Sequence, residues 1–249
     1  MIELEPAEHC KVAPLFSTIL HSVALVHSVL EGKAGARVFV DRAERPQVVL
    51  LAHEAGFQYL AAAGIPDKDA TSEIIATLFE QILLHADEQE MVLFVFGEGL
   101  RQALVVPLTE RGAVTIARKV FCYDPVKHQP LPSWRDWAPH GLTVAVQQSS
   151  TSDGRFAVTL MRGEQQISLC QTVCVGRGMA EIDIHTIEEE RGKGYARLTA
   201  STLIEECLRR NLTPCWSCWP ERVASVKLAQ RLGFMPQPDA PAFFWMPNM

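Results

Sequence analysis

Apolar and polar positions alternate along the first half of the chain in a way that predicts short helices and strands. Apolar residues recur at helical spacing over residues 14–30 and 69–85; Gly32 ends the first helix, and Thr71 or Ser72 caps the start of the second. Residues 98–104 predict a further short helix. Apolar runs bounded by turn residues predict strands over 36–41, 47–53, 57–62, 91–96 and 113–123. This half is therefore expected to form an α/β lobe.

The second half predicts a series of strands interrupted by two helices. Strands are expected over 155–163, 164–176, 179–187, 213–219 and 242–246. One helix should run from Lys193 to Arg210, and another should cover residues 221–234 and stop at Gly233.

The stretch from Tyr123 to His140 contains four prolines and two tryptophans with no sustained period, which predicts a linker. We therefore expect an N-terminal lobe over residues 1–125, a linker over 126–140 and a second lobe over 141–249.

Composition narrows the class of protein. Of the 249 residues, 48% are hydrophobic and 21% are charged, which is typical of a globular chain that folds without disulfides. A formal net charge of -6 disfavours a nucleic-acid partner, because phosphate binding needs clustered Lys and Arg. Because the N-terminus is acidic, we expect no secretion signal. Because no unbroken apolar run reaches about 18 residues, we expect no membrane span. Seven cysteines, an odd number, suit free thiols, so we expect a cytoplasmic protein.

A glycine-rich turn joins the strand over 179–187 to the helix that follows it. Gly192 and Gly194 flank Lys193 there. Because the first N–H groups of a helix have no partner within the helix, such a turn can bind an anion. The glycines leave room for a bulky diphosphate, and Arg191 and Lys193 add positive charge. Taken alone, the stretch also fits a packing device, and it is neither a dinucleotide fingerprint nor a Walker A loop.

The order of elements around this turn resembles the GNAT superfamily of N-acetyltransferases. The family's Q/R-x-x-G-x-G/A motif matches the run from Arg191 to Ala196, and the stretch RLGF over 231–234 matches its closing helix. The resemblance covers about residues 143–245. Residues 27–61 resemble, more loosely, the first lobe of a two-lobed bacterial branch. The resemblance implies an α/β fold with a GNAT-type mixed sheet flanked by helices in the C-terminal lobe, and a smaller α/β N-terminal lobe.

The resemblance also implies acetyl-CoA as the acyl donor and residues that hold it. In the family, main-chain amides of the turn bind the diphosphate, and the pantetheine arm lies along the preceding strand like an added strand. Residues 215–219 would then form the other side of a fork that admits the thioester. The expected cofactor-binding residues are Ile184, Thr186, Ile187, Arg191, Gly192, Lys193, Gly194, Tyr195, Ala196 and Ser225.

Acetyl transfer to an amine needs a base for the ammonium proton and an acid for the leaving thiolate. Glu181, Asp183 and His185 share one face of a strand by its period of two. Glu181 is the preferred base and His185 the second candidate. The three residues fit a solvent-facing sheet surface equally well. The family's asparagine and tyrosine positions hold Ala224 and Ala229 in this chain, so no acid is identified and solvent is left to protonate the thiolate.

Three hypotheses stay open. The first is an acetyl-CoA-dependent N-acetyltransferase acting on a primary amine of a small molecule or a protein, by direct attack with general-base assistance. The second is a non-catalytic acyl-CoA-binding module, which Ala224 and Ala229 favour. The third is a metal or redox protein built on Cys215 and Cys218; their place on a strand disfavours it, and no metal site is expected. The expected partner is an amine-bearing acceptor, with a homodimer left open.

Overall fold

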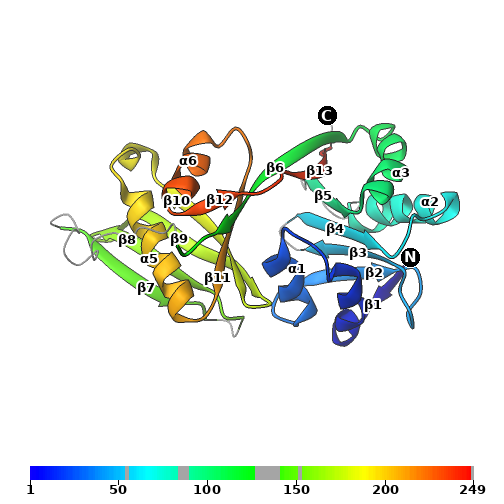
Figure 1. Ribbon diagram of the computed structural model, residues 1–249, viewed down its shortest axis with the longest axis horizontal. Coiled ribbons are helices and arrows are strands. Elements are labelled where there is room, and N and C mark those ends of the chain that lie inside the picture. The colour runs from blue at the N-terminus through cyan, green and yellow to red at the C-terminus, as the bar shows by residue number, and fades with distance from the viewer. Residues whose placement is uncertain (54–55, 84–89, 127–140, 151–152, 248–249) are drawn as a thin grey trace. The chain divides into compact units, whose positions relative to one another are not determined.

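The computed structural model of the protein describes residues 1–53, 56–83, 90–126, 141–150 and 153–247 (Figure 1). The chain divides into two compact units. The first comprises residues 1–22, 29–118 and 239–249, and the second comprises residues 23–28 and 119–238. Each unit combines a mixed sheet with helices, so the α/β prediction is confirmed.

The first unit is built on a sheet with strand order β1-β2-β3-β4-β5-β13-β6. Its strands are β1 (Ile2–Leu4), β2 (Ala36–Val40), β3 (Val48–His53), β4 (Phe57–Ala62), β5 (Met91–Phe96), β13 (Ala240–Trp245) and the first half of β6 (Val114–Tyr123). Among the described strands of this sheet, only β4 and β5 run parallel, and the other neighbours are antiparallel.

Helical segments of the first half of the chain follow the predicted ranges in part. They are η1 (Pro6–Phe16), α1 (Val23–Leu30), α2 (Lys68–Ala76), η2 (Thr77–Ile82) and α3 (Glu98–Thr109). The single helix expected over 14–30 is wrong: Pro14 lies inside a 3-10 segment, and Ser22, at φ +55°, separates it from α1. The predicted caps are also wrong, because the Asp67 side chain, not Thr71 or Ser72, accepts the Ala70 N–H at 2.9 Å.

The second unit contains a sheet with strand order β6-β11-β10-β9-β8-β7, and β12 also pairs with β6. Its strands are the second half of β6, β7 (Thr143–Gln148), β8 (Phe156–Arg162), β9 (Gln165–Gly176), β10 (Met179–Thr186), β11 (Thr213–Cys218) and β12 (Phe234–Pro236). Among its described residues from 119 onward, the helical segments are η3 (Glu188–Glu190), α5 (Tyr195–Arg209) and α6 (Val223–Arg231). Within this sheet β10 and β11 run parallel.

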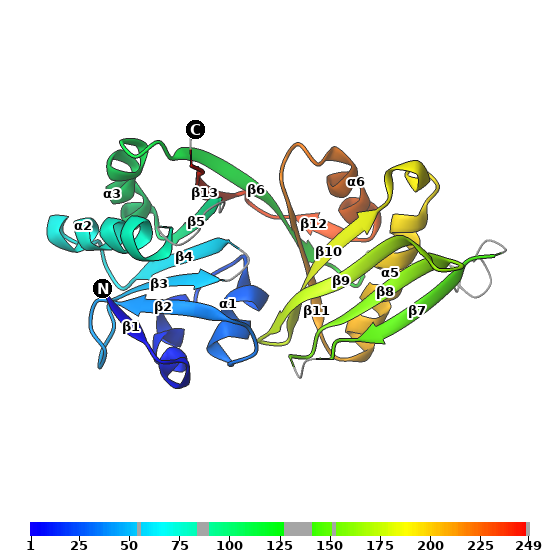
Figure 2. The ribbon, with the colours of Figure 1, turned by 180° about the vertical axis from the view of Figure 1, so that it is seen from behind.

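Helix α5 covers one face of this sheet, in front of it in Figure 1 and behind it in Figure 2. The helix turns Leu198, Leu203 and Cys207 inward, where they join Ile182 and Trp216 in one hydrophobic core. Because strand residues alternate between faces, the polar residues of β10 project from the opposite face. Packing against the core therefore determines which face of β10 carries the side chains that could take part in a reaction.

The two units do not coincide with the lobes expected from the sequence. The change from one unit to the other falls inside β6, between residues 118 and 119, and not near 125. Strand β13 belongs to the first unit, because it pairs with β5 and with the first half of β6. Residues 23–28 are grouped with the second unit. Residues 127–140 of the expected linker lie outside the described residues.

Candidate functional site

A fork opens between β10 and β11. The two strands pair in parallel over three positions, and the last pair is Glu181 with Cys215. Beyond Glu181, the described part of β10 pairs with β9 alone, while β11 continues along β6. One backbone edge of β10 is therefore left open over residues 182–186.

The hydrogen bonds of β10 show which residues face this open edge. Ile187 donates its N–H to the Ile167 carbonyl of β9 at 3.1 Å. In an antiparallel ladder, alternate residues bond toward the same neighbour. Ile184 and Thr186 therefore turn their N–H and C=O groups toward the open edge. The Ile187 amide is already used within the sheet, so of the three predicted strand residues, Ile184 and Thr186 suit an added strand best.

The polar residues of β10 lie on the face away from the core. Asp183 and His185 are exposed, Glu181 is half-buried, and Ile182 is buried on the other side. Glu181 accepts a hydrogen bond from the Ser217 hydroxyl, with 2.7 Å between Oγ and Oε1. Ser217 was not predicted as a site residue. The parallel register places it two residues beyond the partner of Glu181, and the sequence alone does not give that register.

The glycine turn connects this strand to α5. Gly192 and Gly194 have φ values of +79° and +86°, in the left-handed region that favours glycine. Helix α5 begins at Tyr195 with no side chain capping its start. A Cβ built at Gly192 would meet nothing within 4 Å, so packing does not require glycine there. Open space beside uncapped helix amides is what a diphosphate group needs.

A buried carboxylate organises the charges behind the turn. Glu190 accepts from Arg162 of β8 at 2.6 Å and 3.3 Å, and from Lys193 at 3.0 Å. Hydrogen bonds from Arg162 and then Lys193 lower the pKa of Glu190 to about 2. Arg191 donates its Nε–H to the Thr186 carbonyl at 3.2 Å. Arg162 and Lys193 are thus both hydrogen-bonded to the Glu190 carboxylate, and the Arg191 hydrogen bond connects the turn to the end of β10.

A hydroxyl cluster fixes the start of α5 on the sheet. The Ser168 hydroxyl lies 2.9 Å from Thr186 Oγ1 and 3.1 Å from Thr199 Oγ1. The Thr186 side chain is therefore engaged within the unit, and its main chain is the part that faces the open edge. The Tyr195 ring is also turned inward, since it is buried in the core. Tyr195 can reach a cofactor through its amide.

Helix α6 carries Ser225, one of the predicted cofactor-binding residues, and no acid at positions 224 and 229. The Ser225 hydroxyl accepts a hydrogen bond from the Trp216 indole at 3.0 Å, which leaves its own hydrogen to donate. Ala224 is exposed, and Ala229 is fully buried in the core. A tyrosine at position 229 would find no space, so the lack of an acid follows from the packing as well as from the sequence.

The cysteine pair on β11 does not form a chelating or redox unit. Cys215 and Cys218 are three positions apart on a strand, so their side chains point to opposite faces. None of the seven cysteines, all of which lie among the described residues, forms a disulfide. In the part of the chain that the structure describes, no group of three or more His, Cys, Asp or Glu side chains is arranged to hold a metal ion. No helix among the described residues is both long enough and apolar enough to span a bilayer.

Comparison with known proteins agrees with this geometry. The family model for GNAT acetyltransferases matches residues 153–242. The uncharacterized N-acetyltransferase YdfB of Bacillus subtilis (strain 168) is 25% identical over 229 residues, covering 84% of this chain and 85% of that protein. A GCN5-related N-acetyltransferase-like protein from Streptococcus suis has a similar structure, with a TM-score of 0.69 at 21% identity, covering 97% of this chain and 100% of that one. A tandem GNAT protein from the clavulanic acid biosynthesis pathway gives a TM-score of 0.68 at 12% identity, covering 100% and 98%.

Proposed function

We propose that this chain is an N-acetyltransferase of the GNAT superfamily and that it moves the acetyl group of acetyl-CoA to a primary amine at the fork between β10 and β11. The observation that carries the proposal is the turn from Arg191 to Ala196. It joins an open strand edge to an uncapped helix start, and a Cβ at Gly192 would enter empty space.

The cofactor is held mainly by main-chain groups in this proposal. The amides from Gly192 to Ala196 bind the diphosphate, with Lys193 and Arg191 nearby as cations. The open edge at Ile184 and Thr186 binds the pantetheine arm as an added strand. When bound, acetyl-CoA supplies a thioester that is already activated for transfer to an amine.

Glu181 is the base in this proposal. It stands at the last paired position of β10 and β11, where the fork begins. The Ser217 hydroxyl donates to one carboxylate oxygen and so fixes the direction of the carboxylate that accepts the ammonium proton. His185 lies on the same face two residues past Asp183 and is the second candidate.

The acceptor is proposed to be a cationic amine, of a small molecule or of a protein. Glu181 and Asp183 place carboxylates on one face of β10, and Asp183 is exposed. A field of one sign in a site raises the local concentration of the oppositely charged ligand. Because α6 carries no acid at positions 224 and 229, solvent protonates the leaving thiolate.

Steady-state kinetics test the base. Purified protein is assayed for CoA release from acetyl-CoA across a panel of primary amines. We expect Glu181→Gln to lower kcat by about 10²- to 10⁴-fold, because a positioned base contributes that much, and to leave the KM for acetyl-CoA nearly unchanged. Asp183→Asn is the matched control on the same strand face and should have a smaller effect. Full activity of Glu181→Gln would remove Glu181 from the mechanism.

A separate measurement tests the cofactor turn. In isothermal titration calorimetry, we expect the native chain to bind acetyl-CoA and the Gly192→Asp variant to lose that binding, because a carboxylate would stand where the diphosphate sits. Gly178→Asp is the matched control: Gly178 has φ +71° and a Cβ there would also meet nothing within 4 Å, but it lies in the turn between β9 and β10. Equal loss in both variants would mean that the effect is one of folding.

The buried Ala229 and exposed Ala224 favour one rival, a module that binds acyl-CoA without turnover. The same two assays separate it from an enzyme. Binding that Gly192→Asp abolishes, together with no CoA release for any amine of the panel, would select the rival. Release that depends on Glu181 would reject it.

A further inference from the structure

We propose that Cys122 and Cys215 form a site of reversible thiol oxidation, at which a peroxide converts the two thiols into a disulfide beside Glu181. Cys122 lies on β6 and Cys215 on β11, and the antiparallel register sets them directly opposite one another. Side chains at opposite positions project from the same face of a sheet. Both thiols are free in the structure.

The hydrogen bonds of β6 identify the kind of pair. The Val120 carbonyl accepts the Gln237 N–H at 2.9 Å. The Asp124 N–H donates to the Gly233 carbonyl at 3.2 Å. Both bonds point toward the β12 side of β6, and alternate residues bond toward the same side, so Cys122 does as well.

Cys122 therefore makes no backbone hydrogen bond to the cysteine opposite, and the two form a non-hydrogen-bonded pair. In such a pair the Cα atoms are about 4.5 Å apart, closer than in a hydrogen-bonded pair. Disulfides bridge Cα atoms separated by about 4.4–6.8 Å. The pair can therefore be joined with little movement of either strand.

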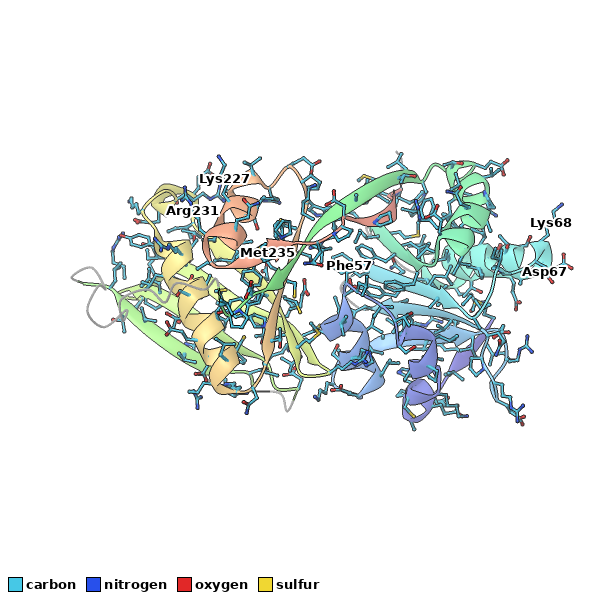
Figure 3. The ribbon with its side chains drawn as sticks, viewed as in Figure 1. Phe57, Asp67, Lys68, Lys227, Arg231 and Met235 are labelled. Atoms are coloured by element: carbon cyan, nitrogen blue, oxygen red, sulfur yellow. The ribbon has the colours of Figure 1, made fainter. Side chains whose placement is uncertain are left out.

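The cysteine pair extends to the proposed base. Cys215 is the parallel partner of Glu181 on its other side. Met235 of β12, labelled in Figure 3, lies opposite Cys122. One row of side chains thus crosses the strands in the order Glu181, Cys215, Cys122, Met235. Oxidation at the two cysteines changes the neighbour of the Glu181 carboxylate from a thiol to a disulfide sulfur.

The two thiols differ in access to solvent, which gives the reaction an order. Cys122 is exposed, so a peroxide reaches it first. Cys215 is half-buried, and burial followed by the Glu181 carboxylate raises the pKa of its thiol well above the usual value. Cys215 is therefore the second thiol to react, and it gives up its proton only as its sulfur attacks.

Hydrogen peroxide supplies the oxidising equivalents. It oxidises the Cys122 thiol to a sulfenic acid and is itself reduced to water. The Cys215 sulfur then attacks the sulfenic sulfur, an S–S bond forms, and the hydroxyl of the sulfenic acid leaves with the Cys215 proton as a second water. Two electrons pass from the two thiols to one peroxide. An added dithiol returns both thiols by exchange.

Peptide mapping tests the linkage. The chain carrying Cys10→Ser, which removes an exposed cysteine able to link two copies, is reduced, treated with hydrogen peroxide, alkylated and cut with trypsin. Cys122 lies in the tryptic peptide 120–127 and Cys215 in 211–222. We expect these peptides to be joined and lighter by two hydrogen atoms, and to separate on reduction with dithiothreitol.

Matched variants assign the bond, because Cys218 lies in the same peptide as Cys215. Cys215→Ser should abolish the link, leaving a Cys122 sulfenic acid that dimedone traps, whereas Cys218→Ser should retain the link. A bond between Cys215 and Cys218, or separate alkylated peptides from a chain whose circular dichroism is native, would overturn the proposal.

The effect on acetyl transfer rests on the proposed function, whereas the linkage does not. We expect oxidation to lower the rate of CoA release and dithiothreitol to restore it, and Cys122→Ser to be insensitive to peroxide. A linked chain with an unchanged rate would overturn the coupling to Glu181. A linked chain that transfers no acetyl group even when reduced would count against the proposed function alone.

Discussion

At the scale of single residues, the Glu190 carboxylate connects the glycine turn to β8. Its two oxygens accept hydrogen bonds from Arg162 and Lys193, and only 9% of its side chain is exposed. A carboxylate that accepts from two cations is stabilised in its ionised form. Glu190 therefore holds Lys193 beside the turn while both cations stay partly open to solvent.

We expect Glu190→Gln to make stability less dependent on pH in acid. The pKa of Glu190 is lowered from 4.5 to about 2 in the folded chain by hydrogen bonds from Arg162 and then Lys193. A lowered pKa stabilises the fold above the unfolded value of 4.5, and this stabilisation is lost as pH falls from 4.5 to about 2. The free energy of unfolding, measured in urea at several pH values, should therefore differ most between native chain and variant at neutral pH, and least near about pH 2.

Glu189→Gln is the matched control for this titration. Glu189 is the exposed neighbour of Glu190, so its substitution removes the same charge without removing the two anchored cations. The pKa of Glu206 is also lowered to about 2, by hydrogen bonding to Arg209 first, but Glu206 is present in every variant and cancels from the comparison. If the difference caused by Glu190→Gln stayed constant over the acid range, the carboxylate would not be paired in solution.

At the scale of elements, the two crossover helices begin in different ways. Helix α2 has an N-cap, since the Asp67 carboxylate, labelled in Figure 3, accepts the Ala70 N–H. Helix α5 begins after Gly194 with no side chain in that role. At a helix start capped by aspartate, the carboxylate already accepts from a first-turn N–H group and adds a negative charge. At an uncapped start, the first N–H groups can still donate to an anion.

We expect Asp67→Ala to destabilise α2 by about 0.5–2 kcal/mol, the usual cost of losing an N-cap side chain. Hydrogen exchange of the peptide that contains α2 reports on that helix separately from the rest of the chain. Asp69→Ala is the matched control, because Asp69 is an exposed acid of the same first turn and is not the cap. Equal exchange rates in the two variants would show that the Asp67 side chain does not cap the helix in solution.

The spacing of apolar residues predicted those helices and strands whose buried face can be recognised from the local sequence. The strands β2 to β6 and β8 to β11 lie where apolar runs predicted them, and the start of α5 follows from the two glycines. The helix expected over 14–30 failed because its apolar residues continue through a break that no Gly or Pro marks. The cap of α2 was missed because Asp67 stands before the predicted start of that helix.

Pairing between distant strands could not be predicted from the same pattern. Apolar residues in β13 show that it is buried, but they do not show that it pairs with β5 and β6 of the first unit. The fork is similar: it depends on where the parallel ladder of β10 and β11 ends, at Glu181 and Cys215. The burial of Glu190 likewise depends on its hydrogen bond with Arg162, which is 28 residues away in sequence.

At the scale of the whole molecule, the two units repeat one topology. In the first unit, antiparallel strands β2, β3 and β4 are followed by a helical crossover through α2 and η2 to the parallel strand β5. In the second, antiparallel strands β8, β9 and β10 are followed by the crossover helix α5 and the parallel strand β11. A helix then follows in each unit, α3 in one and α6 in the other.

The repeat departs from symmetry at the fork. In the first unit, β4 and β5 stay paired over five consecutive positions, from Phe57 with Val92 to Ala61 with Phe96. No open edge is left between them comparable to that of β10 beyond Glu181. The helix start beside them is capped by Asp67, whose negative charge repels a phosphate. At the crossover, the described residues of the first unit therefore lack both the open strand edge and the uncapped helix start that the second unit has.

We expect the full chain to bind one acetyl-CoA, because only one of the two repeats has the open edge and the uncapped start. Calorimetric titration should give a stoichiometry of one ligand per chain. Gly192→Asp should then abolish binding entirely, since the first unit has no second site to reveal, whereas Asp67→Ala should leave both affinity and stoichiometry unchanged. Two ligands per native chain, or residual stoichiometric binding by Gly192→Asp, would mean that paired strands with a capped helix start can hold the cofactor. In that case the fork and the uncapped start of α5 would no longer explain why binding occurs at the second unit.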